Sequence, residues 1–238
     1  MKNNDVKFTL PMLPEPKTLR VRFRKVGNLQ YISHLDLQRT FSRVLVRAGL
    51  PLWYTKGFNP HIKMVFGMPL PVGSESECEM LDIRIERDMS CEEVKARLNA
   101  ELTDELAVLD VYPATRKFTE IAFAEYDFTI LTTGADEALA ARVAAALKTP
   151  LTVTKKSKSG EKQVDILEYL HAAEVTLAGG EIRIHAVLSA AEGKYLSPEA
   201  LVTALRAATG ILSGDPTREQ YRILRRRALL ADGVTEFV

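Results

Sequence analysis

Hydrophobic and polar residues alternate strictly along residues 18–25, which read TLRVRFRK. Three apolar side chains fall on one side of an extended chain, and the other side carries Arg20, Arg22 and Arg24. Alternation with a period of two predicts a strand that buries one face and exposes the other. The sequence therefore predicts a strand with an entirely cationic open face.

A helical period replaces this alternation over residues 33–48, where apolar side chains recur every three or four residues. Ser33 is placed to cap the first turn, Asp36 completes a capping box, and Gly49 suits the position after the last turn. A second stripe of this predicted helix is cationic and consists of Arg39, Arg43 and Arg47. We expect the apolar stripe to face the core and the cationic stripe to lie on the surface.

The patterns that follow complete one structural unit. They predict a strand at 50–55, a turn at 57–61, a strand at 62–73 broken by prolines, a strand at 78–86, a helix from Ser90 to about Leu102, and a strand at 107–115. The resulting order is βαββαβ, the ferredoxin-like pattern. Helices in this pattern cover one face of an antiparallel sheet and leave the other face for a ligand or partner.

A similar order recurs in the second half. It predicts a strand at 124–133, a helix at 136–148, a strand at 150–156, a basic loop at 155–162, a short helix at 164–170, a hairpin through Gly179 and Gly180, a helix from Ser197 to about Ala208, and a strand at 218–230. The predicted fold class is α+β, with two ferredoxin-like βαββαβ units in tandem. We expect a flexible leader at 1–16, a first domain at 17–124 and a second at 125–238. The halves share no close sequence repeat, so the duplication is inferred from element order alone.

Charge is distributed unevenly along the chain. Residues 17–63 contain ten lysines and arginines and one aspartate, a net charge of +9, whereas the whole chain carries +1. A basic block on an otherwise acidic chain fits a polyanionic partner such as RNA. It equally fits a solvated face that is paired with acids elsewhere in the fold.

Cysteines and apolar runs restrict the compartment and the cofactors. The two cysteines, Cys78 and Cys91, are too few and too far apart for a cysteine zinc site or an iron–sulfur cluster. No apolar run approaches the roughly 18 residues of a membrane span, and the N-terminus lacks the apolar segment of a secretory signal. We expect a cytoplasmic protein without a membrane anchor, a metal or a cofactor.

Candidate chemistry lies mainly in the same basic segment. His34, in the first turn of the helix, and His61, in the turn at 57–61, are the weak catalytic candidates, because two histidines can act as acid and base in RNA cleavage. A cap hydrogen bond and an ordinary loop position explain them as well. The predicted nucleic-acid-binding residues are Arg20, Arg22, Arg24, Arg39, Arg43, Arg47, Lys56 and Lys63. The candidate binding loop is Gly57, Phe58, Asn59 and Pro60, which could instead protect an edge strand from aggregation.

The residues that carry these features resemble a bacterial family, the radical-SAM-linked proteins, a domain of unknown function. The shared stretch is FRKVGNLQYISHLDLQRTFSRVLVRAGLPLWYTKGFNPHIKMVFGMPLPVGSESECEMLDI, within a close match over residues 18–85. The family occurs alone or joined to radical S-adenosylmethionine proteins, often in gene neighbourhoods with a ribonuclease and ribosomal proteins. The CxxxCxxC motif of the radical enzyme is absent from this chain. The resemblance thus implies an accessory protein with a radical S-adenosylmethionine protein as partner.

Two hypotheses of function follow. The first is a non-catalytic accessory protein for a radical S-adenosylmethionine enzyme, which binds RNA during RNA modification or processing. The alternative is a metal-independent endoribonuclease-like enzyme that uses His34 and the glycine- and proline-rich loop. The alternative rests on an analogy of fold with repeat-RNA endonucleases of the CRISPR type. We expect the accessory role rather than an enzyme.

Overall fold

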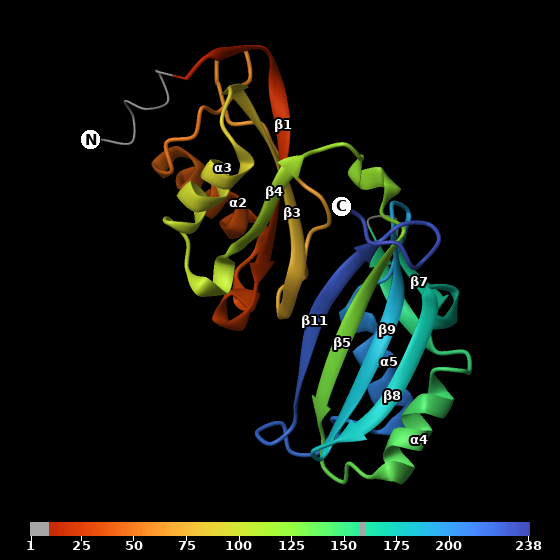
Figure 1. Cartoon of the computed structure of the whole chain (residues 1–238). Helices are drawn as coiled ribbons and strands as arrows, with labels where there is room; N and C mark the ends of the chain where they lie inside the picture. Colours follow the sequence, from red (N-terminus) through yellow and green to blue (C-terminus); the bar gives the residue numbers. More distant parts are fainter. Residues whose placement is uncertain (1–9, 158–159) are drawn as a thin grey trace. The chain divides into compact units, whose positions relative to one another are not determined.

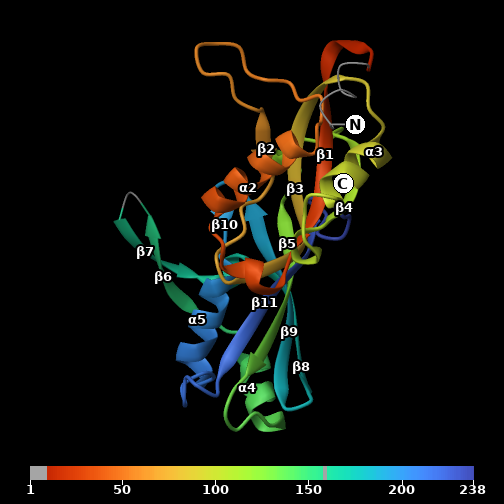
Figure 2. The ribbon, with the colours of Figure 1, turned by 90° about the vertical axis from the view of Figure 1, so that its left-hand side faces the viewer.

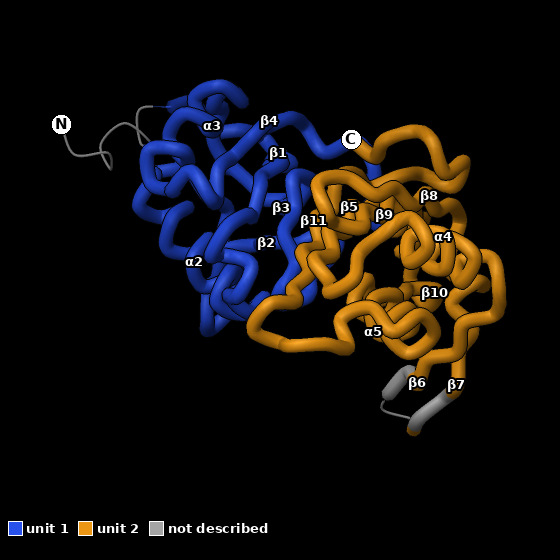
Figure 3. Tube along the Cα trace, turned by 90° about the horizontal axis from the view of Figure 1, so that it is seen from below, with its two compact units in different colours: residues 1–118 blue, residues 119–238 orange. Residues whose placement is uncertain are grey.

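The chain divides into two compact units, residues 1–118 and residues 119–238 (Figure 3). The computed structural model describes residues 10–157 and 160–238. Each unit combines α-helices with antiparallel strands, so the α+β class is confirmed, and the described residues contain four α-helices. None of the helices in the described ranges is long and apolar enough to cross a membrane.

The sheet of the first unit has the strand order β2-β3-β1-β4, and each neighbouring pair is antiparallel. Its strands are β1 (Met12–Lys25), β2 (Met64–Phe66), β3 (Ser74–Arg87) and β4 (Val108–Pro113). The alternation in β1 is as expected, because Leu19, Val21 and Phe23 are fully buried on one face. β1 begins at Met12 and so includes part of the segment expected as a leader. The rest of that leader, residues 1–9, lies outside the described residues.

Two helices cover the same face of this sheet, α2 (His34–Arg47) and α3 (Cys91–Asn99) (Figure 1). Ser33 caps α2 as the sequence predicts, since its hydroxyl accepts a hydrogen bond from the amide of Asp36 at 3.2 Å. Phe41 from α2 packs on Phe23 from β1, with ring centroids 4.7 Å apart. The unit also contains the 3-10 turns η1 (Gly27–Tyr31) and η2 (Asp104–Leu106).

The second unit has the strand order β8-β9-β5-β11, again antiparallel at each pairing. Its elements are β5 (Phe123–Leu131), α4 (Glu137–Ala146), β6 (Thr152–Ser157), β7 (Gly160–Asp165), η4 (Ile166–Glu168), β8 (Leu170–Ala178), β9 (Glu181–Ala191), β10 (Lys194–Tyr195), α5 (Pro198–Thr209) and β11 (Gln220–Leu229). A further 3-10 turn, η3 (Phe118–Glu120), lies at the boundary between the units. α4 and α5 lie on one face of this sheet, and the other face is open (Figure 1).

Several sequence predictions at the level of single elements hold in the second unit. β8 and β9 form the hairpin expected through Gly179 and Gly180, which both have the positive φ of a tight hairpin turn. The closing segment is the strand β11, as the sequence predicts.

Three element predictions are wrong. Residues 50–55 form no strand, because they make only the single bridges of Leu52 to Ile85 and of Tyr54 to Ile62. The basic loop at 155–162 belongs to a two-stranded hairpin, β6 with β7, of which residues 158–159 are not described. The helix at 164–170 shrinks to the three residues of η4, after which the chain enters β8. In each case the structure depends on which segments pair with one another. The local pattern of hydrophobic and polar residues carries no information about that pairing.

Candidate nucleic-acid interface

Arg20 was predicted to bind nucleic acid on the open face of the first sheet, and the structure contradicts this. Its side chain is 0% exposed and forms a two-pronged ion pair with Asp82 on β3. Arg20 Nε donates to Asp82 Oδ1 at 2.8 Å and Nη2 donates to Oδ2 at 2.9 Å. A guanidinium enclosed in this way cannot reach a phosphate, so Arg20 is a structural residue.

The segment that follows β4 explains this burial. It returns across the open face, where the carbonyl of Arg116 accepts a hydrogen bond from Arg20 at 2.8 Å and the ring of Phe118 lies 4.2 Å from the guanidinium carbon. Gly67 accommodates the same ring, because a Cβ there would come within 2.6 Å of Phe118. The sequence pattern of β1 could not reveal this cover, since the covering residues are almost 100 positions away.

The other two strand arginines are only partly exposed. Arg24 donates to the backbone carbonyl of Asp104 at 2.6 Å. Arg22 stands directly opposite Asp110 of β4 in the register of the sheet. With Asp82 beside Arg20 as well, the open face carries carboxylates among its arginines. It is therefore a mixed-charge surface and not the cationic strip that the sequence predicts.

The helix arginines, in contrast, are exposed. Arg39 pairs with Asp36 at 3.2 Å and Arg47 with Glu101 at 2.7 Å, and both side chains remain about 70% exposed. Arg43 lies between them on the same stripe and forms no ion pair within the described residues. The hydroxyl of Ser33 holds the pKa of Asp36 below its ordinary value, so this carboxylate is charged at neutral pH. Exposed ion pairs of this kind contribute little stability and can exchange partners with a phosphate.

The loop that leads into β2 is a closed hairpin over residues 54–62, and it extends beyond the short strand (Figure 2). Tyr54 bridges Ile62 at its base. Above the bridge, the amide of Thr55 donates to the carbonyl of His61 at 2.9 Å, and the amide of His61 donates to the hydroxyl of Thr55 at 3.1 Å. Gly57 takes a φ of 142°, which favours glycine and turns the chain at the tip.

Exposed aromatic and cationic side chains occupy this hairpin and its base. Phe58 at the tip is 111% exposed, and Tyr54 at the base is 42% exposed. Lys56 and Lys63 are exposed and form no ion pair within the described ranges. Gly57, Asn59 and Pro60, the other predicted loop residues, are exposed as well. The name basic–aromatic surface denotes the following exposed side chains of α2, of this hairpin and of the residue after it: Arg39, Arg43, Arg47, Tyr54, Lys56, Phe58 and Lys63.

The two candidate histidines have separate structural roles. His34 packs its ring edge-on against Phe66 of β2, with centroids 5.0 Å apart. His61 closes the hairpin through Nδ1, which lies 3.0 Å from the hydroxyl of Thr55 and 3.2 Å from the carbonyl of Asn59. No contact joins the two rings, so the structure does not assemble them into an acid–base pair.

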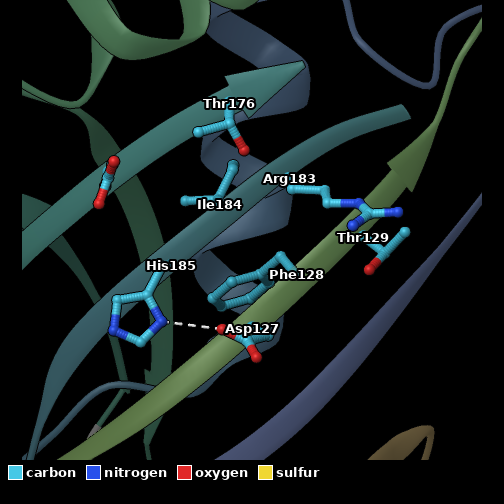
Figure 4. Close-up of a pocket in the computed structure, with 8 residues that line it drawn as sticks. Asp127, Phe128, Thr129, Thr176, Arg183, Ile184 and His185 are labelled. Carbon is cyan, nitrogen blue, oxygen red and sulfur yellow. Dashed lines mark hydrogen bonds and ion pairs between the residues drawn. The ribbon is translucent and has the colours of Figure 1, made fainter. Parts of the chain in front are cut away.

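A different histidine, in the second unit, lies beside carboxylates on the open sheet face (Figure 4). His185 on β9 contacts Asp127 on β5, with Nδ1 2.8 Å from Oδ1, and its Nε2 lies 3.7 Å from Oε1 of Glu125. Asp127 and His185 line a shallow hollow of about 350 Å³, whose wall also includes Arg183. The alternation in β5 and β9 marks both residues as outward-facing, but only the register between the strands brings them together.

This arrangement is poorly suited to catalysis. A general base needs one imidazole nitrogen directed at the substrate, and here a carboxylate lies near each nitrogen. Arg227 in turn binds Glu125, and Arg226 lies 3.5 Å from Asp127. The wall of the hollow itself carries charges of both signs, those of Asp127, Glu174 and Arg183. Among the described residues, no group of three histidine, cysteine or acidic side chains is placed to hold a metal ion. The hollow has the character of an ion-pair network on a sheet surface.

Comparisons with known proteins place the chain in context. A family model described as "Uncharacterized protein conserved in bacteria (DUF2344)" matches residues 18–198, about three quarters of the sequence. No curated protein matches the chain. Among solved structures, it is similar to the crystal structure of an unknown protein from Galdieria sulphuraria, at 11% identity over 89% of this chain and 99% of that chain. The TM-score of 0.26 is too low for that likeness to carry an argument about fold.

Proposed function

Since the chain belongs to this family of uncharacterized bacterial proteins, we propose that it is a non-catalytic accessory protein that binds RNA through the basic–aromatic surface. Its partner in this proposal is a radical S-adenosylmethionine enzyme that acts on RNA. The strand orders β2-β3-β1-β4 and β8-β9-β5-β11 support the further proposal that the two units are ferredoxin-like domains in tandem. In this proposal the first unit carries the RNA-binding surface.

One observation carries the proposal. Cationic and aromatic side chains that the fold leaves exposed gather on two consecutive elements, α2 and the hairpin at 54–62. Cations attract the phosphate backbone without regard to sequence, and exposed rings supply stacking faces for bases. The packing of His34 on Phe66 links the start of α2 to β2, the strand that follows the hairpin.

The number of cations sets the expected salt dependence. The surface contributes five, namely Arg39, Arg43, Arg47, Lys56 and Lys63. If each neutralises one phosphate of a single strand, the logarithm of the affinity falls with the logarithm of salt with a slope of roughly −3.5, from about −0.7 per contact. The ion pairs with Asp36 and Glu101 compete with phosphate and make this slope an upper limit.

Fluorescence anisotropy of a labelled RNA tests the proposal. We expect binding at low salt that the double variant Arg39→Glu/Arg43→Glu weakens by at least tenfold, with a salt slope smaller by about one or two. The matched control is Arg142→Glu/Lys148→Glu, which makes the same change of charge at exposed positions of the second unit. Absence of RNA binding at low salt, or equal losses in the two double variants, contradicts the proposal.

Support for the protein partner comes from the resemblance of residues 18–85 to the radical-SAM-linked proteins. Affinity capture of the tagged chain from its native host, followed by identification of bound protein and RNA, tests this part. We expect a radical S-adenosylmethionine protein among the specific partners, and its absence from repeated captures contradicts the assignment. Metal-independent cleavage of RNA that His34→Ala abolishes would instead establish the endoribonuclease alternative.

A further inference from the structure

We infer that the ligand of the basic–aromatic surface is single-stranded RNA, held by an unpaired base that stacks on the ring of Phe58. This inference rests on the proposed function and specifies its substrate class. The starting observation is that Phe58 is 111% exposed, more than any other large hydrophobic side chain among the described residues. With so large an exposed fraction, the described residues leave the ring accessible to a ligand.

The hairpin below the ring is well defined by hydrogen bonds. Three contacts join Thr55 to His61 across its two arms, and the imidazole of His61 also contacts the carbonyl of Asn59. Pro60, two residues after Phe58, further restricts the backbone of the tip. Because the loop is ordered before binding, stacking a base on Phe58 costs little conformational entropy beyond that of one side chain.

The charges around the ring match a nucleic-acid backbone. Lys56 lies in the hairpin and Lys63 directly follows it, and α2, which packs on β2 through His34 and Phe66, carries the exposed arginine stripe. Tyr54 at the hairpin base offers a second, half-exposed ring. Aromatic side chains interleaved with cations along one path are the arrangement by which proteins bind single strands without reading their sequence.

A double helix suits this geometry less well. In an A-form duplex each base is stacked between its neighbours, so a ring at a hairpin tip meets phosphates and the base-pair edges and finds no free base face. Single strands, loops and bulges present such faces. The cations would still attract a duplex, so the inference predicts a preference for single strands and not an exclusive choice.

The test compares an RNA oligonucleotide as a single strand with the same strand annealed to its complement, for the intact chain and three variants at Phe58. The single strand should bind more tightly than the duplex. Phe58→Leu keeps an apolar side chain but lacks a π face, and it should weaken single-strand binding roughly 5- to 150-fold with little effect on the duplex. Phe58→Tyr should retain the affinity. In Phe58→Trp the single strand should quench the fluorescence of the added indole. Trp53 is present in every variant, and its fluorescence provides the background signal.

The outcomes separate this inference from the proposed function. If charge reversal on α2 abolishes binding while Phe58→Leu changes nothing and duplex binds equally well, stacking is wrong and RNA binding stands. If no RNA binds at low salt, the proposed function and this inference are both wrong. If Phe58→Leu removes a protein partner from the capture experiment and leaves RNA affinity intact, the ring is a protein anchor and the inference is overturned.

Discussion

The ion pair between Arg20 and Asp82 should be a main support of the first unit. Replacing Asp82 with alanine removes two of the hydrogen bonds to a guanidinium whose own side chain is 0% exposed. Breaking a buried pair by removing one partner costs about 3–5 kcal/mol, because the remaining charge is buried without compensation. The Asp82 side chain is 17% exposed, so water can approach the site. We therefore expect a loss of stability at the lower end of this range, about 3 kcal/mol.

Removing both partners should cost less than the two single losses imply. In Arg20→Met/Asp82→Leu neither partner leaves an unpaired charge behind, and apolar replacements of a buried ion pair are often tolerated. The single variants Arg20→Met and Asp82→Leu each lower the free energy of unfolding. We expect the double variant to lose at least about 1 kcal/mol less than the sum of these two losses. Arg43→Ala, at an exposed position, serves as the control and should change stability by less than about 0.5 kcal/mol.

Urea unfolding followed by tryptophan fluorescence measures these changes. Trp53 is the only tryptophan in the sequence and lies in the first unit, with its ring 5.2 Å from the guanidinium of Arg84, so its signal reports that unit separately from the second. The free energy of unfolding follows from the midpoint and slope of the transition. A loss of less than about 1 kcal/mol in Asp82→Ala, or strict additivity in the double variant, would refute the reasoning.

Three further predictions concern local contacts. Gly67→Ala places a methyl group against a phenyl ring, with a nearest approach of 2.6 Å, and should destabilise the first unit by about 1–3 kcal/mol in the same urea assay. Ser33→Ala should destabilise α2 by about 1 kcal/mol through loss of its N-cap, and should raise the pKa of Asp36 toward its ordinary value in an NMR titration. Hydrogen bonds from Thr235 lower the pKa of Asp232 to about 2, and Thr235→Ala should raise it. Because the folded pKa lies below the unfolded value, the stability that Asp232 contributes is present above about pH 4 and is lost as the pH falls toward 2, which acid titration of both proteins measures.

Local pattern predicts the elements of this fold better than it predicts their surfaces. Period-two alternation identifies β1, and the helical repeat with its Ser33 cap identifies α2, because each element's own sequence determines which face it buries. The exposed stripe of Arg39, Arg43 and Arg47 follows from the same helical geometry.

Long-range packing decides what local pattern cannot. Arg20 looks solvent-facing within β1, yet Asp82 and Phe118, 62 and 98 positions away, enclose it. His185 and Asp127 are 58 positions apart and meet only through the register of β5 with β9. The full exposure of Phe58 likewise depends on the hairpin at 54–62. The glycine and proline pattern does not predict that His61 closes this hairpin.

The most direct measurement of the central claim is ultraviolet crosslinking of the intact chain to a single-stranded RNA, followed by mass spectrometry of the crosslinked peptides. The account predicts nucleotide adducts on the peptides that contain Phe58 and Tyr54, with further adducts along α2, and their loss in Arg39→Glu/Arg43→Glu. Adducts concentrated in residues 119–238, or an unchanged pattern in that variant, would contradict the claim that the first unit binds RNA through this surface.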